Sequence, residues 1–256
     1  MGAIPLTAAN ARCWDCQSCP LGADCFPGAM ETGNLRELEG LIEHTAPVHA
    51  GSFLFRQGDA FQHLAVIRMG TVKTYAVDRE GREQTLGFHM PGDFIGLGAI
   101  DDGRHPCNAV ALDTVTLCRL PFRVTAELAS RMPMLQAKLF RLMSRDIARA
   151  TQLSCNNSAE ERLAGFLIGM ADRMASRGYS SSRWQLTMSR MDIASYLRLA
   201  PETLSRLFRR FQAEGLLAVE GREVELRGRE RLQAMAATEP AANAPEGVAQ
   251  ARREAA

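Results

Sequence analysis

The chain has little net charge, no long apolar run and no export signal. Its 256 residues carry a formal net charge of +1 at pH 7, so any basic face that binds nucleic acid must be local. No apolar run approaches the ~20 residues that span a bilayer, and no positive charge precedes the weakly apolar segment Ala3–Ala9. With 46% hydrophobic and 23% charged residues, the composition predicts a soluble, cytoplasmic protein with two modest domains and no membrane partner.

The sequence also lacks the groupings of side chains that enzymes use. Its five histidines are scattered, and no combination of His, Asp and Ser suggests nucleophilic catalysis. The pairs Cys13-x-x-Cys16 and Cys16-x-x-Cys19 would suit a thiol oxidoreductase or an electron carrier, but no βαβ thioredoxin pattern accompanies them. We therefore do not expect an enzyme.

Cysteine is the residue type whose distribution is most informative. Four of the seven cysteines lie within thirteen residues at the spacing C-x2-C-x2-C-x5-C, namely Cys13, Cys16, Cys19 and Cys25. The odd total and the missing export signal argue against a disulfide framework. So many thiols in a reducing compartment suit an iron–sulfur cluster, a zinc site or a thiol redox switch, and the spacing alone leaves all three open.

The apolar pattern divides the chain into five segments and predicts an α+β fold. A short amphipathic stretch, Leu35–Ile42, is followed by short apolar segments separated by glycines, which is typical of a β sandwich or jelly roll. These segments are Phe53–Phe55, Leu64–Ile67, Val72–Val77, Thr85–His89, Phe94–Ile95, Ala109–Leu112 and Val115–Leu120. A capping box at Ser158–Glu161 then opens a helix through about Ala175. The predicted segments are a cysteine-rich loop (1–30), a β-roll (31–130), a long helix (131–156), a helical domain (157–236) and a disordered tail (237–256).

Two short helices near the C-terminus form a helix-turn-helix pattern. The first, Met191–Leu197, follows the N-cap Ser189, and Pro201 suits the first turn of the second, Glu202–Glu214. Two apolar segments after it predict a hairpin wing. A helical hairpin packed on the β-domain would show the same spacing, so DNA binding stays a hypothesis here. In that hypothesis Glu202 and Arg206 contact base edges, and Arg190, Arg209 and Arg210 contact phosphates.

Five short strings make the chain resemble the Crp–Fnr superfamily of transcriptional regulators. They are Gly87-Phe88-His89, His105-Pro106, Ala159–Leu163, Leu186-Thr187-Met188 and Glu202–Arg206. Within the superfamily the chain is most similar to the oxygen-sensing FNR/ANR type. The resemblance implies a cyclic-nucleotide-binding-like β jelly roll, a long dimerisation helix and a C-terminal winged helix-turn-helix domain. It also implies that Glu202, Thr203, Ser205 and Arg206 read a TTGAT-type half-site, and that a homodimer reads a palindrome in double-stranded DNA.

The resemblance further implies a [4Fe–4S] cluster. This type has three clustered ligands at C-x2-C-x5-C, which Cys16, Cys19 and Cys25 match, and one distant ligand, which Cys118 matches. Cys13 stays an alternate ligand or a bystander, and Cys107 and Cys155 are not expected to be ligands.

The implied function is an oxygen-responsive regulator that activates or represses genes of anaerobic metabolism under low oxygen. Its contact with RNA polymerase would lie at Arg79–Arg82. The alternative is a DNA-binding regulator that is stabilised by zinc or controlled by thiols, without iron–sulfur oxygen sensing.

Two stretches depart from the superfamily pattern. Cyclic-nucleotide binders use a Glu and an Arg-Ser pair, and Gly96–Gly98 and His105–Asn108 contain neither, so no cyclic nucleotide is expected. The segment between Leu142-Met143-Ser144 and Ala159–Arg162, which includes the end of the long helix, is about three residues shorter than in the family, close to one helical turn. In the family, an acidic residue on the face where the two helices meet repels its counterpart and weakens the dimer. Ala150 takes that position here, and Asp146 either supplies the repulsion instead or points to solvent. The predicted dimer contacts are Leu139, Leu142, Met143, Ile147 and Ala150.

Overall fold

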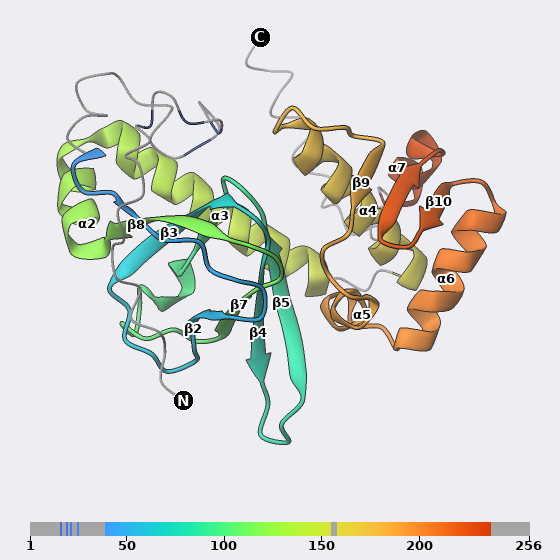
Figure 1. Ribbon diagram of the computed structural model, residues 1–256, viewed down its shortest axis with the longest axis horizontal. Coiled ribbons are helices and arrows are strands. Elements are labelled where there is room, and N and C mark those ends of the chain that lie inside the picture. Colours follow the sequence, from blue (N-terminus) through green and yellow to red (C-terminus); the bar gives the residue numbers. More distant parts are fainter. Residues whose placement is uncertain are drawn as a thin grey trace, which may run out of the picture.

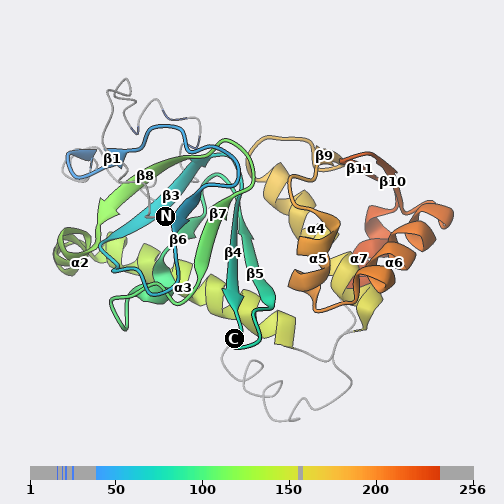
Figure 2. The ribbon, with the colours of Figure 1, turned by 60° about the horizontal axis from the view of Figure 1, so that its bottom comes forward.

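The computed structural model describes Cys16, Cys19, Leu21, Cys25 and residues 39–154 and 158–236. An N-terminal β-roll and a C-terminal helical domain lie on opposite sides of the molecule (Figure 1). The long helix α3 (Pro133–Ser154) runs along the β-roll towards the C-terminal domain (Figure 2). The rest of the predicted loop, the predicted tail and residues 35–38 of the amphipathic stretch lie outside the described residues.

Two four-stranded antiparallel sheets form the β-roll. Successive side chains of a strand point to opposite faces. Strand β3 (His63–Met69) of the first sheet therefore buries Ala65 and Ile67 against the second sheet, and it buries Leu64 and Val66 on the outer face of the first sheet. The first sheet has the order β1 (Glu43–His44), β8 (Thr116–Pro121), β3 (His63–Met69), β6 (Phe94–Ile95), and the second β2 (Phe53–Phe55), β7 (Asn108–Ala111), β4 (Val72–Val77), β5 (Glu83–His89).

Helices cover the outer face of the first sheet. Helix α2 (Phe122–Arg131) follows β8 directly, and Leu128 and Leu135 of α2 and α3 are buried in the cluster that contains Leu64 and Val66. A short 3-10 helix, η2 (Leu97–Ala99), follows β6. The sequence predicted the long helix and the strands of the β-roll except β1, and it missed α2.

The C-terminal domain has the predicted winged helix-turn-helix. Its two N-terminal helix caps form as expected, because Ser158 and Ser189 each complete a capping box and Pro201 opens the second helix of the motif. The sequence missed β9 and α7. The elements are α4 (Ala159–Ala175), β9 (Arg183–Gln185), α5 (Arg190–Leu197), α6 (Pro201–Ala213), β10 (Leu217–Glu220), β11 (Glu223–Leu226) and α7 (Arg229–Ala236).

The two domains share a packed seam rather than touching at one point. Phe88 and Met90, at the end of β5, are buried in the same hydrophobic cluster as the core of the C-terminal domain. Beside them, the carboxylate of Asp93 pairs with Arg173 and Arg177 of the C-terminal domain. This seam fixes how the β-roll is placed relative to the helix-turn-helix.

None of the helices in the described part of the chain is both long enough and apolar enough to cross a membrane.

Candidate functional site

The four cysteines predicted as ligands line one pocket on the outer face of the first sheet. Cys16, Cys19 and Cys25 come from the N-terminal segment, and Cys118 comes from β8. Cys118 is about a hundred residues away from the other three in sequence, so the fold itself brings the distant thiol to the clustered ones. The pocket is completed by the apolar residues Leu21, Ile42, Val66 and Leu120 and by His44 and Arg68.

The surroundings disfavour thiolates unless a cation compensates them. Burial, together with the nearby Glu39, Cys118 and Cys19, raises the pKa of Cys16 to about 12. Burial also raises the pKa of Cys118 to about 11, with Cys19 adding to the effect and Arg68 opposing it. A bound metal deprotonates its thiol ligands outright. The pocket therefore has the character of a site whose negative charge is balanced by a metal centre.

Polar contacts hold the walls of this pocket. The backbone N–H of Cys16 donates to Oε1 of Glu39 at 2.7 Å, which ties the N-terminal segment to the residues before β1. On the other wall, Nδ1 of His44 lies 3.5 Å from Sγ of Cys118, and the two residues are paired across β1 and β8. Sequence reasoning missed Glu39, His44 and Arg68, because their role appears only when the strands pair.

The donor set fits an iron–sulfur cluster in its chemistry. Four soft thiols converge in a mostly apolar pocket. The cavity that they line with their neighbours is about 20 Å³, room for roughly one water molecule. The thiols thus share one pocket, but as they lie in this structure no group of three or more His, Cys, Asp or Glu among the described side chains is placed to hold a metal ion.

The remaining cysteines do not add to this pocket as described. Cys107 is half-buried, burial raises its pKa, and it does not line the pocket. Cys13 and Cys155 lie outside the described residues. The role of Cys13 as an alternate ligand stays a prediction.

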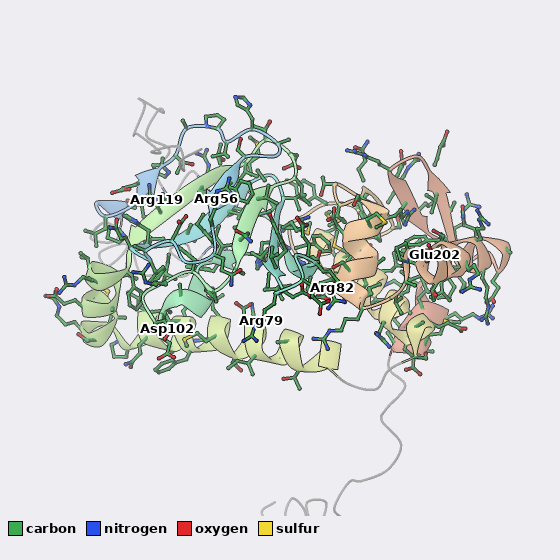
Figure 3. All side chains as sticks on the ribbon, turned by 90° about the horizontal axis from the view of Figure 1, so that it is seen from below. Arg56, Arg79, Arg82, Asp102, Arg119 and Glu202 are labelled. Atoms are coloured by element: carbon green, nitrogen blue, oxygen red, sulfur yellow. The ribbon has the colours of Figure 1, made fainter. Side chains whose placement is uncertain are left out.

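Helix α6 presents the predicted base-reading face. Its apolar side, including Leu204 and Phe211, is buried in the domain, which leaves Glu202, Ser205 and Arg206 exposed. Figure 3 shows Glu202 on the C-terminal domain, well away from the β-roll residue Arg119. The remaining members of the predicted set on this helix are Thr203, whose Oγ1 lies 3.5 Å from Nη2 of Arg206, and the exposed Arg209.

Two of the arginines predicted to contact phosphates have partners within the protein. The guanidinium of Arg190 stacks on the ring of Phe208 at 3.5 Å, and burial lowers its pKa. Arg210 pairs with Glu214 at 2.8 Å and with Glu160 of α4. Both arginines hold α6 to its neighbours, which spacing alone did not reveal.

The predicted dimer contacts fall on two different sides of α3. Leu139 and Leu142 are half-buried and pack on the cluster that includes Cys25 and Leu135. Asp146 lies on that same side, one turn further on, and is half-buried. The exposed side instead carries a row of apolar residues that are three, four and three positions apart, here called the exposed stripe, namely Phe140, Met143, Ile147 and Ala150. Sequence reasoning missed Phe140, although its spacing to Met143 and Ile147 was available as a signal.

A second cavity, of about 160 Å³, opens on the other face of the same sheet. The ring of His105 stacks on Phe55 with centroids 3.7 Å apart, and its buried Nδ1 has no hydrogen-bond partner among the described residues. Arg119, which alternates with Cys118 along β8, also lines this cavity. The sheet thus separates the cysteine pocket from this cavity.

Two family models match the chain, one for each domain. Residues 46–131 match the cyclic nucleotide-binding domain, and residues 161–235 match the Crp-like helix-turn-helix domain.

Curated relatives match nearly the whole length. The transcriptional activator protein Anr of Pseudomonas protegens is 40% identical over 227 residues, which cover 87% of this chain and 92% of that protein. The fumarate and nitrate reduction regulatory protein of Escherichia coli K12 is 40% identical over 224 residues, which cover 86% and 90%. Both names describe regulators rather than enzymes. Among solved structures, FixK2 from Bradyrhizobium japonicum aligns with a TM-score of 0.70 at 25% identity over 78% of this chain and 99% of that chain.

Proposed function

This chain belongs to the Crp–Fnr family of transcriptional regulators, and from that premise we propose that it is an oxygen-responsive regulator carrying a [4Fe–4S] cluster. The observation that carries the proposal is the convergence of Cys16, Cys19, Cys25 and Cys118 on one pocket. Burial in this mostly apolar pocket raises the pKa values of Cys16 and Cys118, so these thiols are costly to ionise unless a metal centre binds them. The homology to Anr and to the fumarate and nitrate reduction regulator supports a cluster over zinc.

These four cysteines would hold the cluster, which supplies reactivity towards oxygen when bound. Cys118 belongs to the sheet, whereas the other three belong to the N-terminal segment. Loss of the cluster would therefore release that segment from the β-roll. The chain's own contribution is to anchor Cys16 through Glu39 and to shield the thiols with apolar side chains.

Sequence-specific DNA binding is assigned to the exposed face of α6. Arg206 is suited to donate two hydrogen bonds to a guanine edge, and Glu202 to accept one from a cytosine amino group. Thr203 and Ser205 complete the reading set for a TTGAT-type half-site, and Arg209 is suited to a phosphate. Arg190 and Arg210 stay proposed phosphate contacts, and within the protein Arg190 stacks on Phe208 and Arg210 pairs with Glu160 and Glu214.

The active form would be a homodimer that pairs the exposed stripe of α3. Phe140 and Ile147 are 61% and 65% exposed, which is unusual for large apolar side chains and indicates a buried role in an assembly. Met143 and Ala150 extend the stripe, whereas Leu139 and Leu142 support it from the inner side. Two recognition helices related by a twofold axis would then read a palindrome.

Control of transcription would require contact with RNA polymerase. The turn between β4 and β5 projects from the β-roll (Figure 1), and the charged side chains of Arg79 and Arg82 lie in this turn (Figure 3). We assign the polymerase contact to this turn and the target genes to anaerobic metabolism, activated or repressed. Cyclic nucleotides are not part of the proposal.

The decisive experiment measures iron, acid-labile sulfide and zinc in protein purified without oxygen, together with binding to a TTGAT-type palindrome before and after air exposure. We expect sulfide and iron at about four per chain and loss of DNA binding in air. Cys118→Ser should remove the cluster, whereas Cys107→Ser, which changes a cysteine outside the pocket, should not. Bound zinc without sulfide, or equal DNA binding after aeration, would support the zinc or thiol alternative instead.

A further inference from the structure

One cation and one imidazole share the pocket with the four thiols. Arg68 follows Val66 by two residues on β3, so both side chains face the pocket, and His44 lies on β1 at the other side of β8. Cys118 is thus flanked across the sheet by His44 on one neighbouring strand and by Val66 on the other. No other positively charged side chain lines this pocket among the described residues.

His44 is placed to act on a single ligand sulfur. Its Nδ1 lies 3.5 Å from Sγ of Cys118, within reach of an N–H···S hydrogen bond. Such a bond strengthens when the sulfur becomes a thiolate, because the acceptor is then charged. Hydrogen bonds to ligand sulfurs are among the features that set the behaviour of iron–sulfur centres.

Arg68 acts on the site through charge. An arginine side chain carries a fixed positive charge in proteins. The charge already opposes the effect of burial on the Cys118 thiol. A cluster ligated by four thiolates carries net negative charge, and a fixed cation beside it stabilises the more negative oxidation state.

We propose that Arg68 and His44 are positioning residues for the cluster, with Arg68 as the fixed counter-charge of the thiolates and His44 as the hydrogen-bond donor to Cys118. Together they would set how easily the cluster gains or loses an electron and how long it survives in air. This inference rests on the proposed function. It assigns part of the cluster's oxygen sensitivity to residues that are not ligands.

The test compares reduction potential and stability of the cluster, neither of which depends on DNA binding. Wild type, Arg68→Met, Arg68→Lys and His44→Phe would be prepared without oxygen and analysed for iron and sulfide. Their midpoint potentials would be measured by redox titration of the visible absorbance, and the loss of that absorbance in air would be timed. Arg119→Met is the matched control, because it removes the same charge from the same sheet on the face away from the pocket.

We expect Arg68→Met to lower the midpoint potential and to speed cluster loss in air by about tenfold, in the range known for residues behind metal ligands. His44→Phe should speed it by about fivefold, the effect of one lost hydrogen bond. Arg68→Lys should retain most of the wild-type behaviour, since it keeps the charge. Folded Arg68→Met protein that cannot retain a cluster would also support the counter-charge role.

Wild-type potential and decay in both Arg68→Met and His44→Phe, with full clusters, would overturn the inference and leave the proposed function intact. An equal effect of Arg119→Met would overturn it as well, because the effect would then be a general one of charge. If Arg68→Met does not fold, His44→Phe decides alone through the same two measurements. Absence of sulfide from the wild type would instead refute the proposed function.

Discussion

Replacing Phe88 by Ala should destabilise the C-terminal domain, although Phe88 belongs to the β-roll. Its side chain is 5% exposed, and its ring lies 5.3 Å from that of Tyr196 and 6.3 Å from that of Phe166, measured between centroids. Both partners belong to the helical domain. The end of β5 therefore supplies a piece of the other domain's core.

The expected size follows from this burial. Truncation of a buried Phe to Ala removes its transfer free energy and leaves a cavity, and typically costs about 3–5 kcal/mol. Domains are stable by only about 5–15 kcal/mol, so the loss is a large fraction of the total. With a urea dependence of about 2 kcal/mol per M, the unfolding midpoint should fall by about 2 M.

A single tryptophan can report on the C-terminal domain alone. The chain has two tryptophans, and a Trp14→Phe background leaves Trp184, which is 6% exposed within that domain. Urea unfolding would be followed by its fluorescence in this background and in Phe88→Ala. Leu86→Ala is the matched control, since Leu86 lies on the same strand but is 48% exposed. If Phe88→Ala moves the Trp184 transition no further than Leu86→Ala does, the shared core is wrong.

Three further predictions concern the seam between the domains, helix α3 and helix α6. Asp93→Asn should cost about 3 kcal/mol, because it leaves two arginines without their buried partner. Burial raises the pKa of Asp93, but Arg173, His89, the backbone N–H of Met90 and Arg177 together lower it below the usual range of an aspartate. Its contribution to stability is therefore present near neutral pH and is lost as the pH falls through this lowered pKa, which acid unfolding of wild type and variant would test. Phe140→Ala should weaken dimerisation in sedimentation without cluster loss, whereas Leu139→Ala should loosen the cluster pocket; equal effects would contradict the two-sided helix. Arg206→Ala should relax base preference, whereas Arg209→Ala should weaken all sequences alike and reduce the salt slope by about one, as binding titrations at several salt concentrations would show.

Local chemistry made much of the fold predictable from sequence. The bounds of α4 were correct because Ser158 and Glu161 form a capping box whose signal is confined to four residues. Phe53–Phe55 and Val72–Val77 were also correct, because glycine turns bracket their apolar segments. Helix α2 was missed because it begins at Phe122, directly after β8 ends at Pro121, with no loop between the two elements.

The site was predictable only in part, because neighbours across a sheet leave no mark in sequence. Period-2 alternation indicates which face of β8 carries Cys118, but not that His44 is the residue beside it. The stacking of Arg190 on Phe208 depends on the packing of α5 against α6. Likewise, the sequence pattern placed Leu139, Leu142 and Met143 on one face of α3, and only the placement of the β-roll shows that they lie on two different sides.

Helix α3 connects the cysteine pocket to the proposed dimer face through opposite sides of one element. On its inner side Leu139 packs in the cluster that contains Cys25, and on its outer side Phe140 and Ile147 are exposed. Close-packed interiors transmit displacement rather than absorb it, so a change in the space between the thiols has to shift or repack the helix. The seam at Phe88 holds the C-terminal domain to the β-roll, which opposes free rotation of the helix-turn-helix. In the proposed function, the state of the cluster therefore controls DNA binding by how two subunits meet along α3, rather than by a hinge within one subunit.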